Sequence, residues 1–183
     1  MTTASVVLAA GAGSRFAGTT HKLAADVQGR PLVSHALTAA VASGLDVLVV
    51  VGAVAFDVPD GVVIVDNPRW ADGLATSLQA GIAAAAGRGH DAVIVAHGDQ
   101  PGIPAAAWQR VAAGSGRPIS IAAYDGRRGH PVRLDASVWP LLPVDGDEGA
   151  AALLRERPDL VGEVACDGDP ADVDTVEDLA RWS

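Results

Sequence analysis

A loop of small residues that carries a cation is the part of this chain best suited to chemistry. An apolar run over residues 6–10 ends in Gly11-Ala12-Gly13-Ser14-Arg15-Phe16, and a second cation, Lys22, follows shortly after. Glycines let backbone N–H groups come close to phosphate oxygens, which bulky side chains would hold away. We therefore expect the N–H groups of this glycine loop (residues 11–16), with Arg15 and Lys22, to bind a triphosphate.

Asp99 is the second residue that points to chemistry, because its carboxylate follows another apolar run in Gly98-Asp99-Gln100-Pro101. Carboxylate oxygens suit Mg²⁺, which usually takes one or two protein carboxylates together with substrate phosphate and water. The alternative is an Asp that only forms the turn before Pro101. Taken together, the glycine loop and Asp99 predict a metal-dependent nucleotide enzyme.

Two common nucleotide-binding motifs do not fit the glycine loop. A dinucleotide fingerprint needs a third Gly where the chain has Phe16. It also needs an acidic residue after the second strand, which here ends in Val51-Gly52. A P-loop needs a Gly-Lys-Ser/Thr sequence that this loop lacks. An ordinary tight turn remains the alternative, although Arg15 and Lys22 are unusual in such a turn.

The composition limits the class of protein. A chain of 183 residues is most simply one domain, residues 1–183, which can bury a core without disulfides or structural metal. The formal net charge of −9 argues against nucleic-acid binding, which uses a basic surface. The single cysteine excludes an internal disulfide, and no apolar run is long enough to span a membrane. The N-terminus lacks the basic start of a signal, so we expect a cytoplasmic protein that binds neither membranes nor nucleic acids.

Short apolar runs alternate with alanine-rich stretches, which predicts an α/β fold with a mainly parallel sheet. The expected strands are residues 5–9, 46–51, 62–65, 91–96 and 118–123. The expected helices are residues 31–43, 73–87, 104–113, 149–157 and 175–182, the last opened by a variant capping box with Asp178. Residues 124–134 break this rhythm and predict a hairpin or a lid. Because ligands bind outside the carboxyl ends of parallel strands, the glycine loop and Asp99 should meet there.

The order of the motifs resembles that of the molybdenum-cofactor nucleotidyltransferases, most closely the molybdopterin cytidylyltransferase branch. The matching segments are residues 8–16, 22–23, 29–32, 67–74, 77–81, 98–101, 129–132, 146–149 and 172–175. The resemblance implies a three-layer α/β/α, Rossmann-like nucleotide-diphospho-sugar transferase fold with a mostly parallel sheet. It also implies Mg²⁺-dependent transfer of CMP from CTP to molybdopterin, in which a phosphate oxygen attacks the α-phosphorus and pyrophosphate leaves.

The resemblance assigns the triphosphate and the base to different parts of one site. Arg15, Lys22 and Asp99 are the expected catalytic residues. The backbone at the end of the first strand would contact the base, and Asn67 and Ser77 would bond the base or the ribose. The full expected nucleotide-binding set is Ala9, Ala10, Gly11, Gly13, Ser14, Arg15, Lys22, Asn67 and Ser77. As alternatives, Asn67 could start a turn and Ser77 could be an ordinary residue on a helix surface.

Three further residues have two interpretations each. Asp174 resembles a second metal ligand beside Asp99, but its acidic segment could equally be a solvated loop. His130, in Gly129-His130-Pro131-Val132, is the expected acceptor-binding residue, with a structural hydrogen-bonding role as the alternative. Gly81 either allows close packing or is a tolerated helix glycine.

Other functions stay open at this point. The same chemistry could use GTP or a different phosphorylated acceptor, because base choice depends on loop geometry. Some relatives of the fold are assigned as NAD(P)H-dependent reductases of a nicotine-derived pigment. A third class is a chaperone that passes molybdenum cofactor to a molybdenum hydroxylase, a handover that an active cytidylyltransferase could also make. Ala150-Ala151 stands where cytidylyltransferases commonly have Ala-Arg, so Arg127, Arg128 or Arg155 would have to supply that cation.

Overall fold

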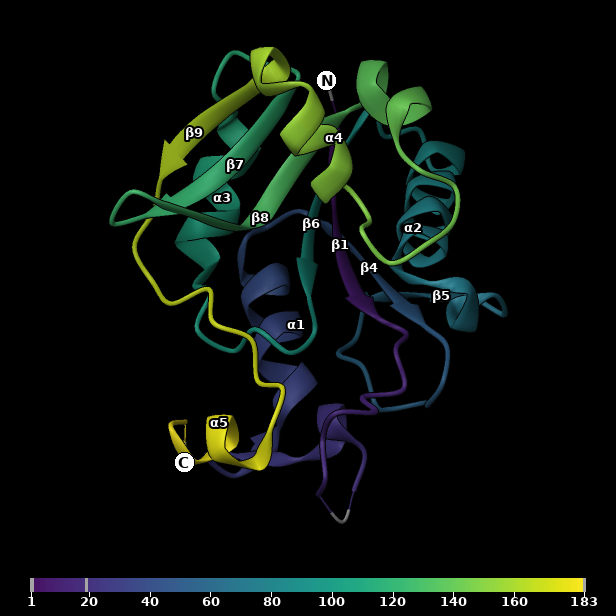
Figure 1. Cartoon of the computed structure of the whole chain (residues 1–183), viewed down its shortest axis with the longest axis vertical. Helices are drawn as coiled ribbons and strands as arrows, with labels where there is room; N and C mark the ends of the chain where they lie inside the picture. The colour runs from purple at the N-terminus through teal and green to yellow at the C-terminus, as the bar shows by residue number, and fades with distance from the viewer. Residues whose placement is uncertain (1, 19, 183) are drawn as a thin grey trace.

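One seven-stranded sheet runs through the molecule, with helices on both of its faces (Figure 1). The structure is a computed structural model that describes residues 2–18 and 20–182. Across the sheet the order is β5 (Val63–Asp66), β4 (Asp46–Val51), β1 (Thr3–Ala9), β6 (Ala92–His97), β8 (Arg127–Asp135), β7 (Ile119–Tyr124) and β9 (Val161–Ala165). Every pairing is parallel except those of β8, which is antiparallel to both neighbours. The mostly parallel α/β fold expected from the sequence is therefore confirmed.

The central strands are apolar on both sides, and this is why helices cover both faces of the sheet. In β1, Val7 and Ala9 face one core while Val6 and Leu8 face the other. The first core is completed by α1 (Leu32–Ala42) and α3 (Ala105–Ala113), and the second by α2 (Leu74–Gly87) and α4 (Ala151–Glu156). The short 3-10 helices are η1 (Lys22–Ala24), η2 (Trp70–Asp72), η3 (Ala136–Leu141) and η4 (Pro158–Leu160).

Residues 124–134 form a hairpin with β7, and the lid interpretation is wrong. β8 inserts between β6 and β7, so its backbone bonds are used in the sheet; Val132, for example, pairs with both Val95 and Ile121. Two further features were not expected from the sequence: β9 and a small hairpin of β2 (Asp26–Val27) and β3 (Arg30–Pro31). β9 lies at the sheet edge and is only partly buried, which weakens its apolar pattern.

After β9 the chain turns back past the carboxyl ends of the strands to α5 (Val176–Ala180), the yellow segment at the lower left of Figure 1. Val173 is fully buried against Val27 and Leu32. Its N–H donates to the backbone oxygen of Asp99 at 3.0 Å. Thr175 and Asp178 form the expected capping box at the start of α5. This C-terminal strap (residues 166–182) therefore lies against the loop that follows β6.

None of the helices within residues 2–18 and 20–182 is both long enough and apolar enough to cross a membrane.

Candidate active site

The glycine loop and Asp99 line one cavity of about 590 Å³ at the carboxyl ends of β1 and β6. These two strands are adjacent, with Leu8 paired to His97, so the loops that follow them must lie side by side. The expected site residues that line the cavity are Ala9, Ala10, Gly11, Gly13, Ser14, Arg15, Lys22, Ser77, Asp99 and Asp174. The predicted meeting of the two motifs is therefore confirmed.

Gly13 allows the glycine loop to fold back against the turn that carries Lys22. Its φ of +62° suits glycine, and an added Cβ would lie 3.0 Å from the Cβ of Lys22. His21 caps that turn, because its Nδ1 accepts from the N–H of Leu23 at 3.2 Å. The local sequence thus places Lys22 beside the loop.

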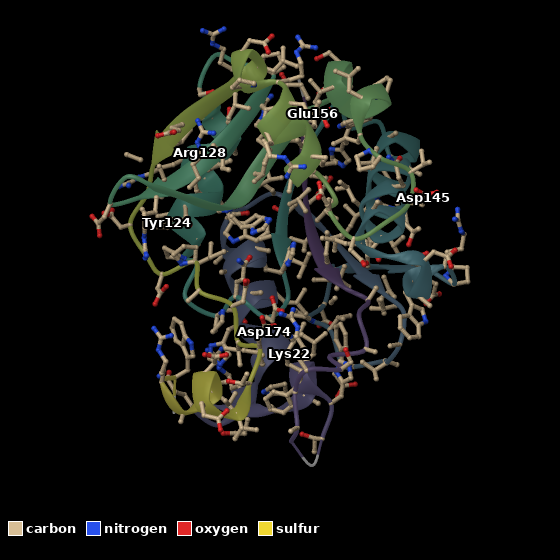
Figure 2. The ribbon with its side chains drawn as sticks, in the orientation of Figure 1. Lys22, Tyr124, Arg128, Asp145, Glu156 and Asp174 are labelled. Carbon is tan, nitrogen blue, oxygen red and sulfur yellow. The ribbon has the colours of Figure 1, made fainter. Side chains whose placement is uncertain are left out.

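Lys22 bridges two carboxylates from distant parts of the chain. Its Nζ donates to Asp99 Oδ2 at 2.6 Å and to Asp174 Oδ1 at 3.0 Å, across 77 and 152 residues respectively. The side chains of Lys22 and Asp99 are only 11% and 16% exposed, so these contacts are poorly screened by water. Figure 2 shows Lys22 and Asp174 together where the C-terminal strap passes below the sheet.

The Lys22 ammonium is kept charged by these neighbours. Burial by itself would lower its pKa, but the Asp99 carboxylate, helped by Asp174, raises it above the ordinary value. A lysine in this state binds anions and does not act as a base at neutral pH. Arg15 adds a second cation, since its Nη1 lies 3.1 Å from Asp174 Oδ2 while its side chain remains 78% exposed. An exposed guanidinium can turn toward a phosphate at little cost.

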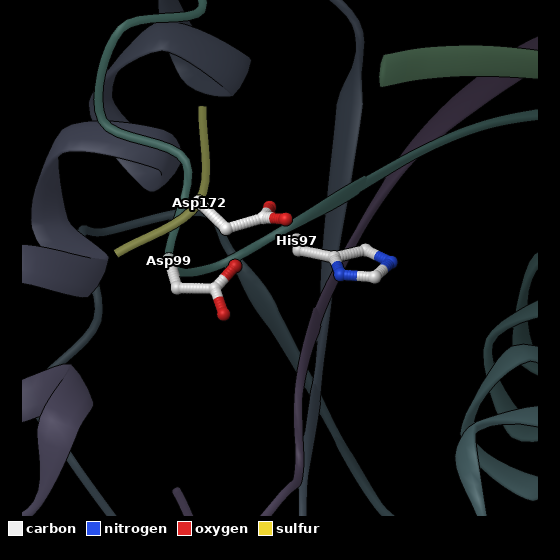
Figure 3. Close-up of side chains that lie close together, drawn as sticks. All are labelled: His97, Asp99 and Asp172. Carbon is white, nitrogen blue, oxygen red and sulfur yellow. The ribbon is translucent and has the colours of Figure 1, made fainter. Parts of the chain in front are cut away.

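A second group of side chains meets on the other side of Asp99. Ligand atoms of His97, Asp99 and Asp172 lie within 4.8 Å of one another. Figure 3 shows the carboxyl groups of Asp99 and Asp172, from different chain segments, directed toward the side where the His97 ring lies. Partial desolvation and the Asp99 carboxylate both raise the pKa of Asp172. The three carboxylates of Asp99, Asp172 and Asp174 thus lie near only two cations, Lys22 and Arg15. This excess of negative charge favours a bound divalent cation.

Asp172 was not among the expected metal ligands, although its motif was recognised. The expected second ligand is Asp174, and both of its carboxylate oxygens are engaged by Lys22 and Arg15. The two acids are separated by one residue outside any helix or strand, and the sequence contains no signal that shows which one faces Asp99.

Asn67 supports the site from beneath the cavity. It is 4% exposed and does not line the cavity. Its Oδ1 accepts from the N–H of Arg69, so its Nδ2 donates to the hydroxyls of Thr76 and Ser77, at 2.9 and 3.0 Å. Of the expected pair, only Ser77 lines the cavity.

His130 lies within β8 and not in a lid, and it is absent from the lining of the cavity. Its ring lies 4.4 Å from that of His97, and Gln100 Nε2 is 3.2 Å from its Nδ1. Burial, with a smaller effect of His97, lowers the pKa of His130 to about 3. His130 is therefore a neutral hydrogen-bonding group at physiological pH.

Another part of the cavity wall comes from two of the segments that match the family motifs, residues 67–74 and 146–149. The lining residues from these segments include Trp70, Gly73 and Asp147. Gly73 has a φ of +111°, and an added Cβ would lie 2.4 Å from the backbone of Gly146.

A nucleotide-sized cavity with a glycine loop, two cations and strand-end carboxylates, set in this α/β fold, defines an NTP transferase. The chain belongs to the MobA-like NTP transferase domain family, which matches residues 5–161. No curated protein sequence matches the chain significantly.

Solved structures agree with this assignment. Rv0371c from Mycobacterium tuberculosis H37Rv is 29% identical over 99% of this chain and 96% of its own, with a TM-score of 0.80. A second structure of Rv0371c, 27% identical over 100% and 98% with a TM-score of 0.77, is a complex with manganese. A nucleotidyl transferase from Methanothermobacter thermautotrophicus, Mth528, is 25% identical over 98% and 95%, with a TM-score of 0.83.

Proposed function

We propose that this chain transfers CMP from CTP to molybdopterin, with a divalent cation as cofactor, and releases pyrophosphate. The observation that carries the proposal is the Lys22 bridge between Asp99 and Asp174, set beside the glycine loop. Lys22 is the only lysine in the chain. The family supports the nucleotidyl transfer, and the sequence motifs described above support CTP and molybdopterin.

An incoming triphosphate would exchange partners with the carboxylates. Arg15 and Lys22 now pair with Asp174, and phosphate oxygens compete for both cations because they carry more charge. Once the cations turn to phosphate, Asp99 and Asp174 are released as oxygen ligands. A divalent cation held by these acids would neutralise phosphate charge when bound.

The remaining residues orient the reactants. Arg15, Lys22 and the loop N–H groups hold the phosphates so that an acceptor phosphate oxygen can attack the α-phosphorus in line with the departing pyrophosphate. No general base is required, since a phosphate acceptor is already ionised at neutral pH. Ser77 accepts from Asn67 and keeps its own hydroxyl proton to donate to an acceptor atom of the base, beside the backbone of Ala9 and Ala10.

The acceptor side of the proposal rests on His130 and on cations outside the nucleotide cavity. His130 would contribute indirectly, by holding the His97 ring, which lies 4.4 Å from its own ring. Arg128 pairs with Glu163, and Arg155 pairs with Glu148. Figure 2 shows Arg128 well away from Lys22.

We further propose that the product cofactor passes to a molybdenum hydroxylase.

Titration of the protein with CTP, GTP, ATP and NADPH, with and without Mg²⁺ or Mn²⁺, tests the proposal. We expect tightest binding of CTP with a divalent cation, and pyrophosphate release once molybdopterin is added. Preference for GTP would indicate a guanylyltransferase. Binding of NADPH alone would indicate a reductase, and pterin binding without pyrophosphate release would indicate a chaperone.

Asp99→Asn is the matched variant for this assay. Loss of one preorganised charge typically costs about 2.7–4 kcal/mol of barrier, so turnover should fall about 100-fold to 1,000-fold. The melting temperature should change little, because Asn still offers an oxygen to Lys22. A fully active Asp99→Asn enzyme would contradict the proposed metal role.

A further inference from the structure

The cluster of His97, Asp99 and Asp172 combines an imidazole with two carboxylates, and this donor set is informative. Mg²⁺ is normally held by carboxylates, phosphates and water, whereas imidazole favours transition metals. Ligand atoms around one such ion, with bonds of about 2.1 Å, lie up to about 4.2 Å apart. The observed separations, all within 4.8 Å, are close to this limit before any ion has drawn the side chains inward.

Asp99 supplies a second, independent observation. Its Oδ2 accepts from Lys22, while its Oδ1 is fully buried and has no hydrogen-bond partner within the described residues. A buried carboxylate oxygen without a partner is costly. A cation in the cluster would satisfy Oδ1 without breaking the contact with Lys22.

The chain segments that carry the three ligands are already held in place. Gln100, 3% exposed, accepts from the N–H of His97 at 3.1 Å and donates to the backbone oxygen of Pro170 at 3.0 Å. One side-chain amide therefore links the end of β6 to the C-terminal strap two residues before Asp172. Such supporting hydrogen bonds orient metal ligands in other proteins.

We propose that His97, Asp99 and Asp172 form a site for a divalent transition-metal ion, occupied before the nucleotide binds, with Mn²⁺ as its spectroscopic probe. The site shares Asp99 with the proposed nucleotidyl transfer and rests on that function for its catalytic use. Binding itself requires only the three side chains and Asp99 Oδ1, so Lys22 can remain paired with Asp99 Oδ2 and Asp174.

Titration of the tag-free, nucleotide-free protein with Mn²⁺, followed by electron paramagnetic resonance, tests this site. We expect one Mn²⁺ per chain, bound more tightly than Mg²⁺ in competition, because an imidazole ligand does not suit Mg²⁺. Pulsed measurements should show coupling of the Mn²⁺ electrons to a nitrogen nucleus, the signature of a bound imidazole.

Variants separate ligation from a structural role. Loss of a residue that only supports a metal ligand typically costs about 10-fold to 100-fold in metal affinity. Loss of a ligand should cost at least as much, so His97→Gln should weaken Mn²⁺ binding at least about tenfold. The same variant should abolish the nitrogen coupling. His35→Gln, on α1, is the control and should change neither. Asp172→Asn should weaken binding, whereas Asp169→Asn, in the same strap, should not.

Each outcome is decisive once circular dichroism shows that the variants fold. Persistence of the nitrogen coupling in His97→Gln, or a wild-type preference for Mg²⁺, would overturn the metal site. If Mn²⁺ binds with imidazole coupling but no nucleotide is used, the proposed function fails and the metal site stands. If CTP is used with Mg²⁺ and His97→Gln changes nothing, the metal site fails and the function stands.

Discussion

Lys22 separates two carboxylates that would otherwise repel each other at close range. Lys22→Ala should therefore have opposite effects on nucleotide and metal. Loss of the charge that holds the triphosphate should lower kcat/KM for CTP at least about 100-fold. Loss of the competing cation should raise the affinity of Asp99 and Asp174 for a divalent cation.

Steady-state kinetics and Mn²⁺ titration together check this prediction. Arg157→Ala removes an exposed cation paired with Asp159 and serves as the control, with both quantities unchanged. Unaltered CTP kinetics in Lys22→Ala would remove Lys22 from the site.

His130 makes the stability of the protein depend on pH. Burial lowers its pKa to about 3, while the unfolded chain has the ordinary value near 6.5. Below pH 6.5 the unfolded state therefore binds a proton that the folded state excludes. Stability is complete above pH 6.5 and is lost as the pH falls toward 3, by about 2 kcal/mol at pH 5 from this residue.

Urea unfolding at pH 8 and pH 5 measures that loss. His130→Asn keeps an acceptor near the position of Nδ1 but cannot titrate, so its free energy of unfolding should fall about 2 kcal/mol less over this interval. Equal losses in wild type and variant would show that His130 does not contribute to the pH dependence.

At the scale of elements, α2 packs directly on the sheet at Gly81. An added Cβ would lie 2.6 Å from Val6 Cγ1 and 3.2 Å from Val50 Cγ2, both in the second core. Of the two interpretations of Gly81, the structure supports close packing. Gly81→Ala should destabilise the protein by about 1–3 kcal/mol, measured by urea unfolding.

Gly87, the last residue of α2, is the matched control for this substitution. A Cβ there would meet no atom within 4 Å. Gly87→Ala should be neutral or stabilise by up to about 1 kcal/mol, because alanine has the higher helix propensity. Equal effects at the two positions would mean that packing at Gly81 is not limiting.

For the molecule as a whole, the C-terminal strap completes the site. Val173 is buried between Asp172 and Asp174, so its packing fixes both acids. Val173→Ala should cost about 2 kcal/mol of stability and should also weaken Mn²⁺ binding. The control is Val176→Ala, at a side chain 44% exposed, which should stay within about 0.5 kcal/mol of wild type.

Calorimetry and Mn²⁺ titration distinguish a local effect from a global one. If Val173→Ala lowers stability but leaves Mn²⁺ affinity intact, the strap is not what positions Asp172.

The sequence was sufficient to predict the class of fold and the edge of the sheet at which the site lies. Alternating apolar runs and helices are local signals, and the topology of parallel strands forces the loops after β1 and β6 together. For the same reason, Arg15, Lys22 and Asp99 could be assigned to one cavity from the sequence alone.

The tertiary structure alone decided how these residues are paired. The insertion of β8 between β6 and β7, which moved His130 out of any lid, depends on backbone pairing between distant segments. Lys22 pairs with Asp174, whereas Asp172 lies beside His97. These two pairings depend on the directions in which the two acids face once Val173, which lies between them in the chain, is buried. Contacts across 77 and 152 residues leave no periodic trace in the chain, so only the folded molecule shows them.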